Sequence, residues 1–217
     1  RKESSAASDV YKRQLLKQAK DEQLSVFDND NKSTKVKVDY KIIDENKVDS
    51  LIKKLKVQKE ICFDTETSSL DIQSAKLAGI AFSCEEGKAY YVPTLSNTEE
   101  ILKKLSPLFS DSNILLIGHN LKYDIQILSK YGILFHENVF DTMLAHYVIS
   151  PEGSQKLDVL SENYLNHKCI PIEDVIGKKG VNQMSMIDIP VENVYEYACE
   201  DADITLRLKN ICLLYTS

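Results

Sequence analysis

The 217-residue sequence lacks long apolar runs, an excess of basic residues and any cysteine pattern typical of a metal site. Nothing in it resembles a membrane-spanning segment or a secretory signal, so no membrane partner is expected. The net charge of −6 is unusual for a protein that holds nucleic acid on a broad basic surface, so any phosphate chemistry must depend on local cations. The five cysteines show no CxxC or Cys/His metal spacing. Their odd, scattered count favours a reduced, cytoplasmic protein.

The composition is that of a globular domain. The chain is 43% hydrophobic and 28% charged, which is enough to bury one sizeable core. Internal repeats and low-complexity tracts are absent from the sequence. We therefore expect one folded domain.

The two ends of the chain share an unusual coding pattern. Residues 9–14 read DVYKRQ, which the DNA GATGTGTATAAGAGACAG encodes. The reverse complement of that DNA, read from its second base with one T added, encodes CLLYTS, the sequence of residues 212–217. This inverted repeat resembles the transposon ends used in sequencing libraries. We expect residues 1–14 and 212–217 to be non-native translated adapter, residues 15–37 to be a linker and residues 38–211 to be a domain cut from a longer chain.

Hydrophobic periodicity and turn signals predict an α/β fold with a mixed five-stranded sheet flanked by helices. Asp49 and Asn97 stand at predicted helix starts, with Glu100 placed as in a capping box. Glu85-Glu86-Gly87 predicts a hairpin turn. The expected strands are 36–43, 59–63, 76–84, 88–92 and 114–117, and further helices are expected from about 121 to 128, 140 to 147, 157 to 164 and 190 to 210.

Two carboxylates stand at the end of the strand that is expected to be central. Asp64 and Glu66 are two residues apart, so in an extended strand their side chains point to the same face. Two like charges aimed at one point repel each other unless a cation lies between them. The pair is therefore a candidate metal site that needs further carboxylates, although a solvated turn is the commoner explanation of such a pattern.

Two helical pairs supply the missing groups. Asp124 follows Asn120 by four residues, and Asp201 follows Tyr197 by four, so each pair shares one helix face. Polar pairs at this spacing are common on solvated helices, and neither pair alone indicates a function. Together with Asp64 and Glu66, however, they place four carboxylates on three elements, a set that fits a two-metal site.

Three segments resemble the exonuclease motifs of the 3′–5′ proofreading exonucleases, in the tyrosine branch of the DEDD superfamily. They are Phe63–Thr67, Asn120–Asp124 and Tyr197–Asp201. The similarity extends to the exonuclease domain of the bacterial family A DNA polymerases I, over roughly residues 38–210. Its further segments are Leu77–Ser83, Ala89–Pro93, Phe140–Leu144 and Gly177–Gly180. The resemblance implies a ribonuclease H-like fold.

The resemblance also implies site roles. Asp64, Glu66, Asp124 and Asp201 would hold two divalent ions, Mg²⁺ or Mn²⁺, because all the ligands are oxygens. Tyr197 would orient the attacking water with Glu66. The implied contacts to substrate come from Thr65, Leu70, Asn120 and Tyr123. The expected substrate is DNA with a single-stranded or frayed 3′ end, and the expected partner is the polymerase domain of the parent chain.

Two other interpretations stay open at this point. A ribonuclease D-like exoribonuclease shares the carboxylates and the tyrosine but usually lacks segments like Phe140-Asp141-Thr142 and Ala89-Tyr90-Tyr91. A non-catalytic DNA-binding module keeps the fold after losing carboxylates. Among the remaining polar residues, Asp203 is predicted to be a helix-face charge, and His136, His146 and His167 show no ligand spacing. The resemblance implies that His119 is not the general base of the histidine branch, because that histidine belongs in the third motif, where Tyr197 stands.

Overall fold

The computed structural model describes residues 36–180 and 183–214. The predicted adapter at residues 1–14 lies outside these residues, as does nearly all of the predicted linker at 15–37. Residues 212–214 are described, and they continue the last helix. The origin of both ends therefore stays a prediction.

Within the described residues, six strands form one mixed sheet in the order β1-β4-β3-β2-β5-β6. Strand β3 is antiparallel to β2 and β4, whereas the other neighbours pair in parallel. The predicted mixed α/β sheet is confirmed. The strands are β1 (Asp39–Ile42), β2 (Glu60–Thr67), β3 (Leu77–Glu85), β4 (Lys88–Pro93), β5 (Leu115–Gly118) and β6 (Val139–Asp141).

The predicted count of five strands was wrong, because β6 was missed. This edge strand has three residues and pairs in parallel with β5, with Gly118 opposite Asp141. Three residues are too few to show an alternating pattern. The sequence instead suggested that a helix opens at Phe140, whereas α5 begins at Thr142.

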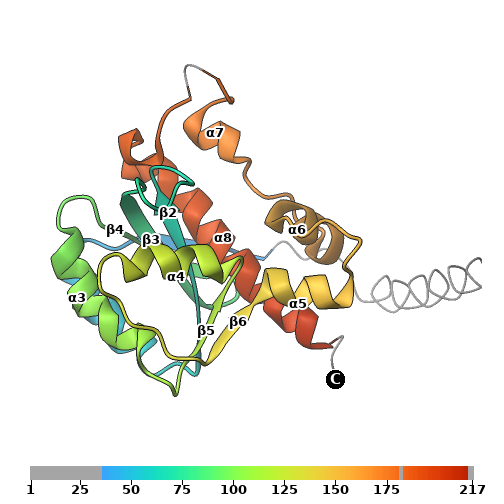
Figure 1. Cartoon of the computed structure of the whole chain (residues 1–217), viewed down its shortest axis with the longest axis horizontal. Helices are drawn as coiled ribbons and strands as arrows, with labels where there is room; N and C mark the ends of the chain where they lie inside the picture. The colour runs from blue at the N-terminus through green and yellow to red at the C-terminus, as the bar shows by residue number, and fades with distance from the viewer. Residues whose placement is uncertain (1–35, 181–182, 215–217) are drawn as a thin grey trace, which may run out of the picture. The chain divides into compact units, whose positions relative to one another are not determined.

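The helices cover both faces of the sheet (Figure 1). They are α2 (Val48–Leu55), α3 (Thr98–Phe109), α4 (Leu121–Ser129), α5 (Thr142–Ile149), α6 (Leu157–Leu165), α7 (Ile172–Ile176) and α8 (Val191–Leu214), with 3₁₀ turns η1 (Glu45–Lys47) and η2 (Met186–Asp188). None of the helices in the described ranges is long and apolar enough to cross a membrane.

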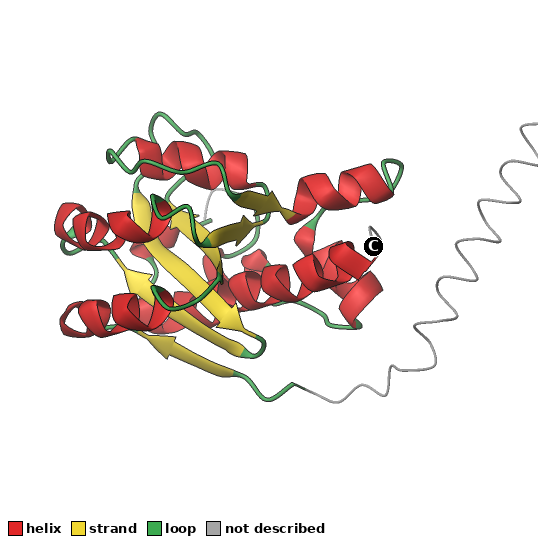
Figure 2. Ribbon diagram, turned by 90° about the horizontal axis from the view of Figure 1, so that it is seen from below, coloured by secondary structure: helices red, strands yellow, loops and turns green. Residues whose placement is uncertain are grey.

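The core lies in two layers, one on each side of the sheet. Figure 2 shows helices on both sides of the strands. On one face, large side chains of the sheet such as Phe63 and Phe82 pack with α2, α3 and α4. On the other face, Ala78, Ala81 and Ala89 pack with α8. Small residues on the sheet let the long helix approach closely. The small side chains of Ala198 and Ala202 on α8 are fully buried in this contact.

Gly87 and Asn97 stand at two junctions that the sequence predicts, a hairpin turn and a helix start. Gly87 closes the predicted β3–β4 hairpin with φ = 74°, a left-handed conformation that favours glycine. Asn97 immediately precedes α3, as predicted, but its side chain makes no hydrogen bond to the helix backbone. Its side-chain amide instead donates to Glu100 and to Glu45, and its backbone amide donates to the Thr94 carbonyl. The capping box is therefore not formed.

Asp203 was predicted to be a helix-face charge, and this was wrong. Its side chain is fully buried. It accepts hydrogen bonds from the Tyr40 hydroxyl at 2.9 Å and from the Gly87 amide at 2.7 Å. These contacts fix α8 to β1 and to the β3–β4 turn, two residues beyond Asp201. A helical pattern cannot show this, because both partners come from the sheet.

Candidate functional site

The end of β2 distributes three polar side chains between the two faces of the sheet. Asp64 lies opposite Ala81, which belongs to the layer packed on α8, whereas Thr65 lies opposite Ile80 in the other layer. Since successive strand residues alternate, Glu66 lies on the same face as Asp64. Strand β2 therefore places Asp64 and Glu66 on one face of the sheet, as the sequence predicts.

Helix α8 brings a third carboxylate to this face. Carboxylate oxygens of Asp64, Glu66 and Asp201 all lie within 4.8 Å of one another. Tyr197, one turn earlier on α8, makes a side-chain hydrogen bond to Asp201. The spacing of four residues on α8 thus places the phenol beside the carboxylate group, as the sequence predicted.

Asp124 reaches the same strand end from the opposite layer. It is nearly fully buried, and its Oδ1 accepts hydrogen bonds from the Thr65 amide at 3.0 Å and the Thr65 hydroxyl at 2.5 Å. Among the acids whose charges raise the pKa of Asp64, Asp124 acts most strongly. The four carboxylates therefore divide into a group of three, with Asp124 adjoining it at Asp64. The family resemblance implies the same division, with Asp64, Glu66 and Asp201 at one ion and Asp64 with Asp124 at the other.

All four carboxylates have raised pKa values. Burial is the main cause for all four, and it raises the pKa of Glu66 to about 8 and those of Asp124 and Asp201 to about 7. Burial and the charges of Asp124, Glu66 and Asp201 hold the pKa of Asp64 well above its usual range. Burial and the nearby Asp201 raise the pKa of Tyr197, so its hydroxyl stays protonated.

The donor set fits a hard divalent cation. Within the described residues, Glu66 Oε1 is buried and has no hydrogen-bond partner. An unpaired buried carboxylate oxygen is costly unless it binds a cation. Because every nearby ligand is a carboxylate oxygen, the arrangement suits Mg²⁺ or Mn²⁺ rather than a thiophilic metal.

A residue that the sequence analysis did not single out positions the start of α4. The Asp141 carboxylate accepts hydrogen bonds from the Asn120 and Leu121 amides, at 3.1 and 2.9 Å. The same carboxylate caps α5 by accepting hydrogen bonds from the Met143 and Leu144 amides. Asn120 has φ = 63°, a left-handed conformation that is uncommon outside glycine. Its side chain does not cap α4 and is exposed at the site. The Asp-Thr pair at the start of α5 was the available signal.

The turn after β2 carries the predicted apolar contact. Leu70 is 89% exposed. The Tyr123 hydroxyl donates to the Ser69 carbonyl at 2.7 Å and lies 2.6 Å from the Thr67 hydroxyl. Tyr123 therefore holds the turn that presents Leu70, and any contact of Tyr123 with substrate remains a prediction.

A groove with a volume of about 480 Å³ opens beside the carboxylates. Tyr197, Asp201 and Asn120 lie along it together with residues of α6 and of the segment before α7. Lys156 and Lys168 also line this groove. The groove therefore combines apolar walls with two cations beside the candidate site.

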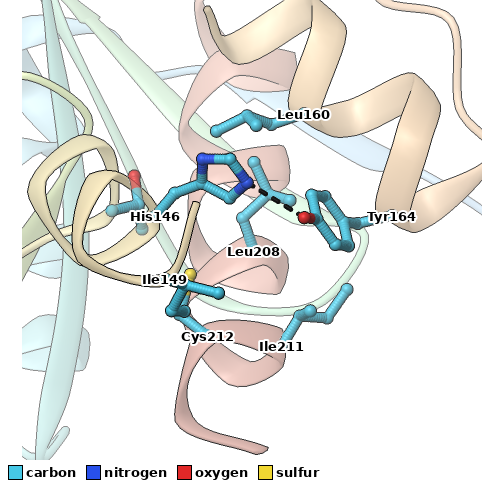
Figure 3. Close-up of a pocket in the computed structure, with 8 residues that line it drawn as sticks. His146, Ile149, Leu160, Tyr164, Leu208, Ile211 and Cys212 are labelled. Atoms are coloured by element: carbon cyan, nitrogen blue, oxygen red, sulfur yellow. Dashed lines mark hydrogen bonds between the residues drawn. The ribbon is translucent and has the colours of Figure 1, made fainter. Parts of the chain in front are cut away.

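A second cavity, shown in Figure 3, has no such chemistry. Its volume is about 10 Å³, room for about one water molecule, and its walls are almost entirely apolar. His146 lies at its edge, with Nδ1 2.5 Å from Gln155 Oε1 and Nε2 3.0 Å from the Tyr164 hydroxyl. The cavity is a packing gap between α5, α6 and α8, and His146 is buried beside it.

Comparison with known sequences identifies relatives over most of the chain. A family profile described as 3′-5′ exonuclease matches residues 40–213. DNA polymerase I of Borreliella burgdorferi is 40% identical over 220 residues, covering 93% of this chain and 24% of the relative. DNA polymerase I of Pseudomonas aeruginosa is 38% identical over 184 residues, covering 79% and 20%. The chain thus spans about a quarter of the length of these curated relatives.

Solved structures show the same fold at low identity. Escherichia coli RNase D, an exoribonuclease involved in structured RNA processing, has a TM-score of 0.66 at 16% identity, over 82% of this chain and 45% of that one. The POL domain of Pol1 from M. smegmatis has a TM-score of 0.63 at 16% identity, over 81% and 27%. The RRP6 catalytic core from Trypanosoma brucei has a TM-score of 0.64 at 19% identity, over 82% and 47%. These likenesses confirm the ribonuclease H-like fold.

Proposed function

Since the chain belongs to the 3′–5′ exonuclease family found in bacterial DNA polymerases I, we propose that it hydrolyses DNA from the 3′ end and releases nucleoside 5′-monophosphates. The observation that carries this proposal is the convergence of Asp64, Glu66 and Asp201, from two elements, around a buried unpaired oxygen of Glu66. Asp124 adjoins this group through Asp64.

The carboxylates would hold two divalent ions, Mg²⁺ or Mn²⁺. Asp64, Glu66 and Asp201 would hold one ion, and Asp64 with Asp124 would hold the second. When bound, such ions lower the pKa of an attacking water and neutralise charge on the leaving 3′-oxygen. The protein contributes fixed ligands: Thr65 holds Asp124 by two hydrogen bonds, and Tyr197 holds Asp201.

Tyr197 and Glu66 would orient the water. The raised pKa keeps the Tyr197 hydroxyl protonated, so it remains a hydrogen-bond donor throughout the working pH range. The Glu66 oxygen without a protein partner is free to accept from water or to bind a cation. Holding a nucleophile in this way removes an orientational cost from the reaction.

The 3′ end of the substrate would lie against Leu70 and Asn120. An exposed leucine offers an apolar face for a terminal base, and stacking of this kind does not depend on base identity. Tyr123 would act partly by holding the turn of Leu70. The Thr65 hydroxyl donates a hydrogen bond to Asp124, so we propose that Thr65 affects the substrate through that carboxylate.

The alternatives have less support. The likeness to E. coli RNase D at 16% identity concerns the fold, whereas the relatives at 38–40% identity are DNA polymerases. A non-catalytic module would not need to retain four converging carboxylates and Tyr197. We also propose that in its parent chain this domain proofreads for a polymerase domain, in line with relatives about four times as long. The five cysteines, all within the described residues, form no disulfide, which supports a cytoplasmic location.

Digestion of end-labelled oligonucleotides tests the function. The full chain is incubated with single-stranded DNA or with RNA of the same sequence, in Mg²⁺, Mn²⁺ or EDTA. We expect stepwise shortening of the DNA from its 3′ end, release of 5′-monophosphates and no cleavage in EDTA. Asp201→Asn is the matched control for contaminating nucleases. Faster cleavage of RNA than of DNA would favour the ribonuclease D-like alternative, and metal-independent cleavage would refute the site.

A further inference from the structure

A second group of metal-ligating side chains lies outside the carboxylate site. His167 and Cys169 belong to the segment between α6 and α7, and Glu200 belongs to α8. One ligand atom from each lies within 4.8 Å of the other two. His167 and Glu200 are 33 residues apart, so no sequence spacing could show this group.

The Glu200 carboxylate is held in one orientation. The residue is nearly buried, its Oε2 accepts a hydrogen bond from the Ile170 amide at 2.6 Å, and its Oε1 lies 2.8 Å from His167 Nε2. A backbone donor on one oxygen leaves the other directed at the imidazole and the thiol. Metal ligands in proteins are commonly oriented by such outer hydrogen bonds.

The distances between the three ligand atoms can be compared with those around a tetrahedral zinc ion. Zinc bonds of about 2.0–2.3 Å place neighbouring ligand atoms roughly 3.3–3.8 Å apart. The His167–Glu200 contact would have to open by about 0.5 Å, and no pair would have to close by more than about 1.5 Å. The side chain of His167 is 35% exposed and therefore has room to turn.

The charges around the thiol favour a cation. Cys169 is half-buried, and the carboxylates of Glu200, Asp201 and Asp158 all act on it electrostatically. Lys168 is the neighbouring cation and lines the groove. Cys169 also lines the groove, which gives an ion a route from solvent and a water molecule a place to complete the coordination.

We propose that His167, Cys169 and Glu200 bind a thiophilic divalent cation of the zinc class, with water as the fourth ligand. A thiolate and an imidazole select Zn²⁺ over Mg²⁺, which distinguishes this site from the all-oxygen carboxylate site. Binding releases the Cys169 thiol proton to solvent, together with the proton of His167 when that ring is charged. The ion would tie the groove wall at residues 167–170 to α8, directly before Asp201.

Titration of the metal-free full chain with Co²⁺ tests the site. A cobalt–thiolate bond gives a charge-transfer band in the near ultraviolet that carboxylate ligands do not give. We expect this band to saturate at one equivalent per chain, to disappear in Cys169→Ser, and to be lost on addition of Zn²⁺. His167→Gln should weaken binding at least about tenfold, since even the loss of an outer hydrogen bond to a ligand costs about that much.

Two matched variants separate this site from the rest of the protein. Cys84→Ser removes another half-buried thiol and should keep the band, as should Asp64→Asn, which disrupts the carboxylate site. In the Asp64→Asn background Zn²⁺ should raise the melting temperature, and adding Cys169→Ser to that background should abolish the rise. Absence of the band in the wild type, or its persistence in Cys169→Ser, would show that the three side chains form only a hydrogen-bonded contact.

Discussion

At the scale of single residues, the site depends on keeping like charges together. Asp64, Glu66 and Asp201 repel one another, and burial strengthens the repulsion because it removes the charges from water. Asp124 is the best supported of the four carboxylates, since Thr65 donates two hydrogen bonds to it. The arrangement costs stability in the metal-free protein and is useful only when cations bind.

Asp124 and Tyr197 should differ in how much activity they control. Asp124→Ala removes a ligand and should abolish cleavage, while binding of single-stranded DNA survives through stacking and backbone contacts. Tyr197→Phe deletes one hydroxyl and should slow cleavage by roughly 10²–10⁴-fold. Single-turnover cleavage by the three proteins at fixed Mg²⁺ measures both effects. Normal cleavage by Asp124→Ala with a dead Tyr197→Phe would refute the two-ion assignment.

Glu66→Gln should stabilise the metal-free protein while inactivating it. Burial, Asp201 and Asp124 raise the pKa of Glu66 from 4.5 to about 8. When folding raises the pKa of a carboxyl group, the folded protein loses stability as the pH rises from the unfolded-state pKa through the folded-state pKa. In EDTA at pH 8.5 we expect the variant to melt at least about 2 °C higher than wild type, which is about 1 kcal/mol for a chain of this length.

The pH dependence supplies the control for this prediction. At pH 5 Glu66 is protonated in the folded protein, so the two melting temperatures should converge. Saturating Mn²⁺ should reverse the order at pH 8.5, because only the wild type keeps the full ligand set. A constant difference between the two proteins at both pH values would mean that packing, not charge, separates them.

At the scale of helices and strands, Asp141 is the residue on which two site helices depend. It stands at the end of β6, caps α5 and accepts the first amides of α4. Asn120 and Asp124 both lie on that helix start. Asp141 therefore couples the edge of the sheet to the second exonuclease motif.

Asp141→Ala should lower both stability and turnover. Loss of one helix cap costs about 0.5–2 kcal/mol, and two caps are lost here. The start of α4 should shift, so we expect kcat to fall more than KM rises. Thermal melting and steady-state kinetics measure this, with Asp49→Ala in the first turn of α2 as a control remote from the site. Equal activity of the two variants would show that α4 is positioned by its core contacts alone.

At the scale of the whole molecule, one long helix organises the fold. Helix α8 packs along one face of the sheet and carries Tyr197, Asp201, Asp203 and Glu200. It also reaches Cys212, which is nearly buried against α5 and α6 beside the small cavity (Figure 3). The end of the helix therefore packs on the domain although its last residues are expected to be foreign.

Deletion of residues 1–14 should leave the melting temperature and the nuclease activity unchanged. Truncation after Ile211 removes the partly packed Cys212 and should lower the melting temperature by no more than about 4 °C, which corresponds to the roughly 1–2 kcal/mol of one small side chain. Differential scanning fluorimetry and the oligonucleotide assay check both. Loss of activity in either truncation would mean that the ends are part of the functional domain.

The sequence by itself determined the features that depend on backbone periodicity. Alternation along β2 put Asp64 and Glu66 on one face, the four-residue spacing joined Tyr197 to Asp201, and Gly87 marked the hairpin. These follow from local geometry, because the repeat of a strand or helix is set by its own backbone. The same four-residue spacing singled out Asp124, and a family resemblance carried by short motifs then implied how the four carboxylates act together.

Only the tertiary structure decided which distant side chains meet. The double cap by Asp141, the burial of Asp203 against Tyr40, and the meeting of His167 with Glu200 all join elements far apart in the chain. Three-residue β6 is itself a product of pairing with β5. Such contacts depend on how two helical layers pack against a twisted sheet, and no local repeat of the sequence records that packing.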